Sequence, residues 1–278
     1  MPTLQIARSW CGGYRSRSFL LEYRTLALRG VLGLILPAIL TLCVGGRGFA
    51  QELHVAAAAD LQPVLPTLAA QYEQQTGVKI VSSFGSSATL AQQITNGAPV
   101  DVFLSADTVH PQQLVTAGLA TDLTAYARGV LVLWARRDSP AQPVSVAALT
   151  SDKVQRLAIA NELHAPYGLA AATALRALGV YDAVKPKLVV GENISQTAQF
   201  ALTGNAQAGL ISLTIASSPA YRDAGTFVVM PKVYGEMLQS GAVIAASKQQ
   251  VAAKALVMWL ASAAVQKQLP GFGLDAVK

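Results

Sequence analysis

Cysteine is nearly absent from this sequence. The chain has 278 residues and only two cysteines, Cys11 and Cys43, and both lie in the first 50 residues. We expect that segment to be removed, which leaves a mature chain with no thiol for a disulfide, a metal ligand or a nucleophile. A chain of about 228 residues can bury a sufficient apolar core without disulfides.

A hydrophobic run long enough to span a membrane is also lacking. The apolar run Val31–Val44 is shorter than the roughly 20 residues that a membrane-spanning helix needs. Arginines precede it, and the small residues of Gly48-Phe49-Ala50 follow it. This order is typical of a secretory signal peptide. We therefore predict a cleavable signal peptide over residues 1–50, with a membrane anchor as the alternative.

Charge is sparse, at 13% of residues, and the net charge of +6 is concentrated at the N-terminus. Six arginines and one acid lie in residues 1–50, so the mature chain keeps 15 basic and 14 acidic residues, a net charge of about +1. Nucleic-acid binding requires a clustered basic face. We expect no nucleic-acid partner.

Patterns typical of metal or catalytic sites are missing as well. His54, His110 and His164 are far apart in sequence and have no cysteine or carboxylate pattern around them, which argues against a metal site. Ser87 lies in no nucleophile-elbow pattern, and no sequence feature supplies it with a base. We predict that the protein is not an enzyme and carries no cofactor.

What the mature sequence does contain is a regular alternation of short apolar runs and alanine-rich helical segments. The expected strands are Leu53–Ala58, Lys79–Ser83, Val100–Ser105, Val130–Ala135, Leu157–Ala160, Leu188–Val190, Ala208–Leu213 and Val243–Ala246. The expected helices are Leu61–Gln75, Ala88–Asn96, Pro111–Ala117, Leu169–Leu178, Gln196–Thr203 and Gln250–Ser262. This alternation predicts an α/β fold with largely parallel sheet covered on both faces. The length allows one large domain or two lobes of about 100 residues each.

Glycines support the ends of five of these helices. They stand where the helical pattern stops, and a left-handed helix cap prefers glycine. The glycines are Gly77, Gly97, Gly118, Gly179 and Gly204.

Four places where a strand ends and a helix begins carry the functional signal. They are Ala57–Leu61, where Asp60 can cap a helix, Ser83–Ala88, Ala165–Gly168 and Gly191–Gln196, where Asn193 and Gln196 form a capping-box pattern. Each one alone is typical of an ordinary capped helix. In open α/β sheets such turns gather at the carboxyl ends of the strands, where ligands bind. Unpaired N–H groups and the helix dipole make a helix start suited to anions.

Four converging helix starts would bind an anion without any charged side chain. Removing the water from a dianion costs at least several kcal/mol. A hydrogen bond to a charged group returns about 1.5–3 kcal/mol, and a favourable helix end adds up to about 2 kcal/mol. Some five to seven donors would therefore offset desolvation. Fixed donors also set a cavity radius, which separates larger tetrahedral oxyanions from smaller sulfate.

The sequence resembles the periplasmic molybdate-binding proteins of ABC transporters. The resemblance runs in order over nearly the whole mature chain. It is carried by AAAADL (Ala56–Leu61), SFGSSATLAQQITNGAPVDVFLSAD (Ser83–Asp107), YARGVLVLW (Tyr126–Trp134), APYGLAA (Ala165–Ala171), GENISQTAQF (Gly191–Phe200) and GNAQAGLISL (Gly204–Leu213). The combination of these segments is specific, whereas one alone would be weak.

The resemblance implies a type II periplasmic-binding fold: two doubly wound α/β lobes joined by two crossover strands, with the ligand in the cleft between them. One lobe would comprise residues 51–129 plus 229–278, and the other residues 130–228. The implied oxyanion contacts are Ala59, Asp60, Ser87, Tyr167 and Ile194. Molybdenum would be bound at these residues only as the molybdate oxyanion.

Two positions depart from the family pattern. Some members have serine, threonine or asparagine in the first loop, where this chain has Ala59 and Asp60. A carboxylate would repel a dianion unless Asp60 turns its side chain away to cap the helix and offers only its N–H. Some members contact the anion through a tyrosine where this chain has Ser212, so that the nearby hydroxyl would come from Tyr167.

The function implied by the resemblance is that of an exported, monomeric binding protein in the periplasm. It would capture molybdate first and tungstate second and pass the anion to an ABC permease and its ATPase. The alternative is a binding protein for another small oxyanion, such as sulfate or phosphate.

Overall fold

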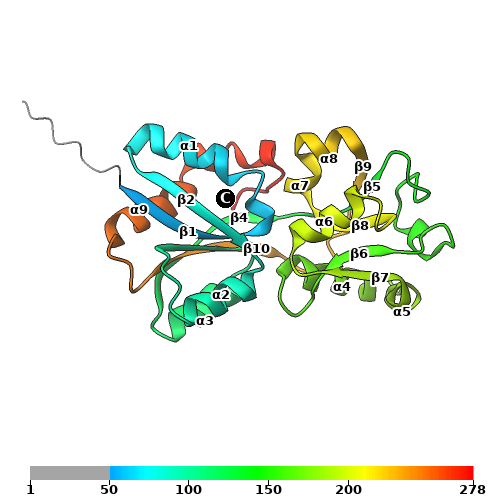
Figure 1. The fold of residues 1–278 in the computed structure, drawn as a ribbon, viewed down its shortest axis with the longest axis horizontal. Helices are drawn as coiled ribbons and strands as arrows, with labels where there is room; N and C mark the ends of the chain where they lie inside the picture. Colours follow the sequence, from blue (N-terminus) through cyan, green and yellow to red (C-terminus); the bar gives the residue numbers. More distant parts are fainter. Residues whose placement is uncertain (1–50, 278) are drawn as a thin grey trace, which may run out of the picture. The chain divides into compact units, whose positions relative to one another are not determined.

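The computed structural model describes residues 51–277, so the predicted signal peptide over residues 1–50 lies outside the described part. Residues 51–277 form two lobes, each built on a five-stranded sheet with helices packed against it (Figure 1). Within residues 51–277, no helix combines the length and the apolar character needed to cross a membrane.

The first lobe has the strand order β2-β1-β3-β10-β4. Its strands are β1 (Glu52–Ala58), β2 (Lys79–Gly85), β3 (Val102–Ser105), β4 (Ala120–Gly129) and β10 (Met237–Ile244). Its helices are η1 (Ala59–Leu61), α1 (Leu65–Thr76), α2 (Ser87–Thr95), α3 (Val109–Thr116), α9 (Gln250–Leu260), α10 (Ala263–Gln266) and η4 (Leu269–Phe272). Strands β1, β2 and β3 run parallel, and β10 is antiparallel to both of its neighbours.

Alternation along the strands explains why both faces of this sheet are covered. Successive side chains of a strand point to opposite faces. In β1, Val55 and Ala57 pack in the core beneath α1 and α9, whereas Ala56 packs in a separate core with α2 and α3. Figure 1 shows these two helix pairs on opposite faces of the sheet.

The second lobe has the strand order β7-β6-β8-β5-β9. Its strands are β5 (Leu131–Arg136), β6 (Leu157–Ala160), β7 (Leu188–Gly191), β8 (Ala208–Ser212) and β9 (Gly225–Val229). Its helices are η2 (Ala147–Thr150), α4 (Pro166–Ala177), α5 (Tyr181–Val184), η3 (Lys185–Lys187), α6 (Ile194–Leu202), α7 (Leu213–Ser217) and α8 (Pro219–Ala224). Strands β6, β7 and β8 are parallel, and β5 is antiparallel to β8 and β9.

The chain passes between the lobes twice, from β4 to β5 and from β9 to β10. The first passage lies between Gly129 and Leu131, and the second between Val229 and Met237. We propose lobes of residues 51–129 plus 229–278 and 130–228; Val229 itself still pairs with Val132 in the second sheet.

The structure confirms seven of the eight expected strands, with shifted ends, and the five glycine caps; the eighth, Val243–Ala246, overlaps β10 only at Val243 and Ile244. All five glycines have positive φ angles, between 68° and 87°. It also corrects three expectations. The expected helix from Leu61 to Gln75 is split into η1 and α1, because α1 begins next to Pro66, which suits a first helical turn. Strands β4 and β9 were not predicted. Each sheet also mixes parallel and antiparallel pairs. In the first sheet the antiparallel strand is β10, which enters by the return passage, and in the second sheet it is β5.

Candidate functional site

The four predicted helix starts meet at one small cavity. All five residues expected to contact the anion line it: Ala59, Asp60, Ser87, Tyr167 and Ile194. The other lining residues are Ala58, Gly85, Ser86, Ala106, Ala165, Pro166 and Asn193. None of these is a lysine, an arginine or a histidine. The cavity is therefore a site of backbone and hydroxyl donors from both lobes, with one carboxyl group, that of Asp60.

Parallel strands explain why distant segments converge here. The carboxyl ends of β1 and β2 lie side by side, since Ala58 is paired with Gly85. In the second lobe, Ala160 at the end of β6 is paired with Gly191 at the end of β7. A helix begins just after each of these ends, so two helix starts from each lobe face the same cavity.

Ser87 begins α2 and is fully buried. Ser86 before it is the N-cap, and its hydroxyl accepts from Thr89 N–H at 3.3 Å. The hydroxyl of Ser87 accepts from Ala106 N–H at 3.1 Å. Because that bond uses a lone pair, the hydrogen of the Ser87 hydroxyl stays free to donate. Ser87 can therefore offer both its O–H and its first-turn N–H to a ligand.

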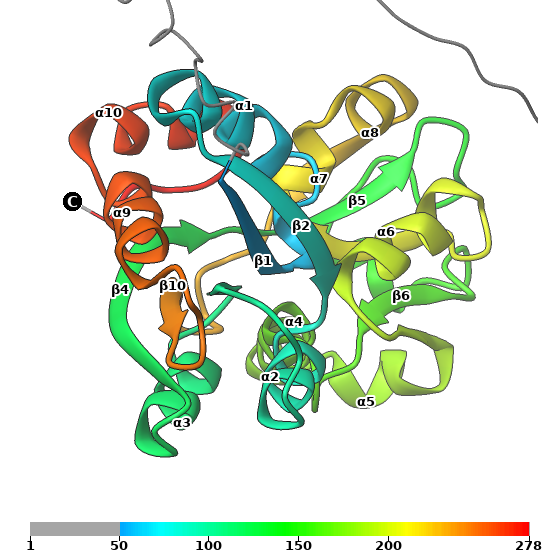
Figure 2. The same cartoon turned by 60° about the vertical axis from the view of Figure 1, so that its left-hand side comes forward.

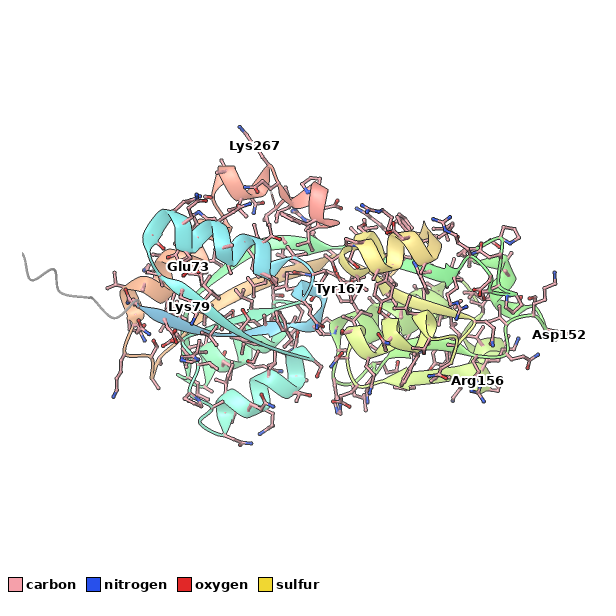
Figure 3. All side chains as sticks on the ribbon, turned by 45° about the horizontal axis from the view of Figure 1, so that its top comes forward. Glu73, Lys79, Asp152, Arg156, Tyr167 and Lys267 are labelled. Carbon is pink, nitrogen blue, oxygen red and sulfur yellow. The ribbon has the colours of Figure 1, made fainter. Side chains whose placement is uncertain are left out.

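Tyr167 lies in the first turn of α4, behind Pro166. Its side chain is buried, and Figure 3 shows the residue where the two lobes meet. A Cβ added to Gly129 would lie 2.5 Å from the Tyr167 hydroxyl, so the phenol lies against the first passage between the lobes. Tyr167 lines the cavity, and its backbone N–H lies in the first turn of α4, where no intrahelical partner exists for it.

Ile194 begins α6 after the N-cap Asn193. The Asn193 side chain accepts from Gln196 N–H at 3.0 Å, and the Gln196 side chain accepts from Glu192 N–H at 2.6 Å. The predicted pairing of Asn193 with Gln196 is confirmed in this form. The cap holds the start of α6 rigidly and leaves the N–H of Ile194 in the first turn.

Asp60 does not cap a helix as predicted. It lies inside η1, and its Oδ2 accepts from Gln239 Nε2 at 2.6 Å. The residue is fully buried, and its Oδ1 has no hydrogen-bond partner among residues 51–277. Burial raises the pKa of the Asp60 carboxyl to about 7, against opposing hydrogen bonds from Gln239 and Tyr167. The prediction was wrong because the side chain of Asp60 is bonded by Gln239 of β10, far away in sequence, and not by a first-turn N–H.

Hydrogen bonds across the cleft hold the two lobes together around the cavity. The start of α2 meets the segment before α4 (Figure 2), where Ala88 N–H donates to the His164 carbonyl at 3.1 Å. Thr214 of α7 donates its hydroxyl to the Asp60 carbonyl at 2.7 Å. At the rim, the Ser195 hydroxyl donates to Gln62 at 2.7 Å. The structure is therefore that of a closed cleft.

Gln239 and Thr214 support the site by bonding Asp60, and both were missed by the sequence analysis. Gln239 is fully buried on β10 and also lies 3.5 Å from the Tyr167 hydroxyl. The sequence pointed away from Gln239, because Gln239 and Ser240 are polar residues that interrupt an apolar run. Such an interruption favours a loop over a buried strand. Among residues 51–277, no cluster of histidine, cysteine or acidic side chains could hold a metal ion.

A two-lobed α/β protein that closes on a cavity of neutral donors belongs to the class of solute-binding proteins. The chain is a member of the bacterial extracellular solute-binding protein family, whose model matches residues 53–275. The family implied by the sequence is thereby confirmed. The protein is a substrate-binding protein and not an enzyme.

Within this family, the chain is similar to proteins that are named for binding molybdate. The molybdate-binding protein ModA of Azotobacter vinelandii is 35% identical over 227 residues, which cover 81% of this chain and 90% of that protein. The molybdate-binding protein ModA of Rhodobacter capsulatus is 36% identical over 238 residues, or 84% of this chain and 88% of that protein. A solved structure of the periplasmic molybdate-binding protein of Azotobacter vinelandii matches with a TM-score of 0.74 and 28% identity, covering 81% of this chain and all of that one.

Proposed function

We propose that this protein is the periplasmic substrate-binding component of an ABC transporter, and that it captures molybdate first and tungstate second. The observation that carries the proposal is the convergence of four helix starts, two from each lobe, on one cavity. None of the residues that line this cavity has a cationic side chain. The names of the relatives from Azotobacter vinelandii and Rhodobacter capsulatus support molybdate as the ligand. Molybdate would be the cargo of the protein and not a cofactor.

The proposed contacts are Ala59, Asp60, Ser87, Tyr167 and Ile194. Ser87 would donate through its hydroxyl and its N–H, and the others would donate through their N–H groups. Hydrogen bonds to a charged group are worth about 1.5–3 kcal/mol each. A set of this size would offset the cost of dehydrating a dianion. Because neutral donors form no ion pair, the anion could still be released to the transporter.

Closure of the cleft would be the signal to the membrane partners. In the open form, the anion would bind mainly to the first lobe, through Asp60 and Ser87. Closure would then bring in Tyr167 and Ile194 from the second lobe. The permease and its ATPase would recognise the closed monomer.

Calorimetry with molybdate, tungstate, sulfate and phosphate tests the proposed ligand. For the mature chain, residues 51–278, we expect strong binding of molybdate and tungstate and weaker binding of sulfate and phosphate, because the rigid donors fix the cavity radius. Sulfate binding as strong as that of molybdate would reject the molybdate assignment. Absence of heat with all four anions would reject the oxyanion class.

Thr214→Val tests the contribution of closure to affinity. The change removes the hydroxyl that bonds the Asp60 carbonyl across the cleft at 2.7 Å. One such hydrogen bond is worth about 1 kcal/mol, so we expect molybdate to bind about fivefold more weakly and to dissociate faster. Thr203→Val is the matched control, because the Thr203 hydroxyl is exposed and bonds only within its own helix. Equal affinities for the two variants would contradict this role of Thr214.

A further inference from the structure

Asp60 is a carboxyl group in a position where an ionised carboxylate is disfavoured. It is fully buried and lines the cavity proposed for a dianion. None of the ion pairs among residues 51–277 involves Asp60. A buried charge without a partner is costly, and a neighbouring dianion would add repulsion.

Around Asp60, the buried hydrogen-bond acceptors outnumber the donors. Oδ2 accepts from Gln239, but Oδ1 of Asp60 and Oε1 of Gln239 are both buried acceptors without a partner among the described residues. Leaving a buried acceptor without a hydrogen-bond partner costs free energy. A proton on Oδ1 would remove the charge and convert one of these acceptors into a donor.

The groups that face Asp60 provide no positive charge. From the second lobe, the Thr214 hydroxyl bonds the backbone carbonyl of Asp60, and the phenol of Tyr167 acts on its carboxyl. From its own lobe, it faces Gln239 of β10 and the phenol of Tyr126 of β4. The carboxyl of Asp107 also acts electrostatically on Tyr126.

Two histidine–carboxylate pairs form the remaining titratable surroundings. His110 bonds Asp107 at 2.7 Å, and His164 lies 3.5 Å from Glu192, next to the cavity residue Ala165. Both histidines are therefore paired with carboxylates of their own and not with Asp60.

Closure is what removes Asp60 from water. Thr214 and Tyr167, which interact with Asp60, belong to the second lobe, so separating the lobes would remove both and open Asp60 to water. An exposed aspartate is ionised at neutral pH, with a usual pKa near 3.9. In the closed structure, burial raises this pKa to about 7. A dianion beside it would raise the pKa further.

We propose that closure on the anion is coupled to the uptake of one proton by Asp60, so that the site holds the dianion together with a neutral carboxylic acid. This inference rests on the proposed function, because the dianion is part of the coupled step. The proton comes from solvent and forms an O–H bond on Oδ1, and no other bond is made or broken. Release of the anion on opening returns the proton to solvent. Asp60 is thereby a pH-dependent determinant of affinity.

The sign of the pH dependence follows from the two states. The free, open protein has lost the proton above a pH of about 4, whereas the bound form keeps it to about 7 or higher. Between these limits the bound state carries one more proton than the free state. Affinity for molybdate should therefore fall as pH rises, by about tenfold per pH unit.

Calorimetry of molybdate binding in buffers of different ionisation enthalpy measures this proton directly. At pH 6.5 we expect uptake of about one proton per molybdate by the mature protein. In Asp60→Asn the uptake should vanish, the pH dependence of affinity should flatten, and binding at pH 8 should be equal to or tighter than in the unmodified protein. His164→Gln and His110→Gln are the controls and should keep the uptake.

The possible outcomes separate this inference from the proposed function. Molybdate binding without proton uptake, or with uptake unchanged in Asp60→Asn, would overturn the proton coupling and leave the proposed function standing. No binding of any oxyanion would overturn both. The buffer series on the unmodified protein decides the question even if Asp60→Asn fails to fold.

Discussion

Ser87→Ala is expected to bind molybdate about 10- to 100-fold more weakly than the unmodified protein. The hydroxyl of Ser87 is fully buried, and its lone pair already accepts from Ala106 N–H at 3.1 Å. Its hydrogen therefore remains available to the proposed anion. A hydrogen bond to a charged group is worth about 1.5–3 kcal/mol, which corresponds to the expected loss. Calorimetric titration with molybdate measures it.

Ser86→Ala is the matched control for this change. The two serines are adjacent, and both line the cavity. The Ser86 hydroxyl donates to Thr89 Oγ1 at 2.7 Å and accepts from Thr89 N–H, so it has no hydrogen left for a ligand. Its loss should cost about 1 kcal/mol of stability as a missing helix cap, with little change in affinity. If both variants weakened binding equally, Ser87 would have no special role as a donor.

Gly168→Ala is expected to destabilise the fold and to weaken binding together. A Cβ at this position would lie 2.4 Å from the carbonyl oxygen of Ala160 and 2.5 Å from that of Asn161. These are backbone atoms at the end of β6, which cannot turn aside as a side chain can. The start of α4 must therefore move and carry the N–H of Tyr167 with it.

Overpacking of this kind costs about 1–3 kcal/mol, or more where backbone must shift. In a chain of this size we expect the unfolding midpoint to fall by roughly 5–10 °C and molybdate affinity to fall at least about tenfold. Thermal melts and calorimetry measure the two effects. Gly271→Ala is the control, because a Cβ there meets no atom within 4 Å and the φ angle is not positive. An unchanged melting temperature in Gly168→Ala would contradict the close packing of α4 on β6.

Local signals were sufficient to predict much of the fold. Helix ends marked by glycine were correct because a left-handed cap excludes most other residues. The helix starts at Ser87 and Ile194 were placed by their caps, Ser86 and Asn193, whose side chains bond the first turn in the structure. The convergence of the four starts followed from the rule that parallel strands end at one edge of a sheet. The two-lobed architecture and the binding function were predicted from the resemblance to a known family. The periodicity of apolar residues predicted neither.

The errors arose where tertiary contacts override local pattern. Strand β4 has an irregular burial pattern and a positive φ at Asp122, so its sequence shows no clean alternation. Gln239 is a polar residue on a strand, and only its contact with Asp60, 179 residues away in sequence, explains its burial. The orientation of Asp60 was wrong for the same reason. A helix cap can be predicted from residues that are neighbours in sequence. A hydrogen-bond partner on a distant strand, such as Gln239 on β10 for Asp60, cannot be predicted in this way.

The position of the Tyr167 phenol has a consequence for how far the two lobes can approach. The hydroxyl occupies the space that a side chain at residue 129 would fill, directly beside the passage on which the lobes would pivot. A side chain at residue 129 would collide with the phenol, so the absence of one at Gly129 lets the two lobes pack closely here. Tyr167 lines the cavity, and its hydroxyl lies against the passage between the lobes. A single residue thus connects the cavity to the passage.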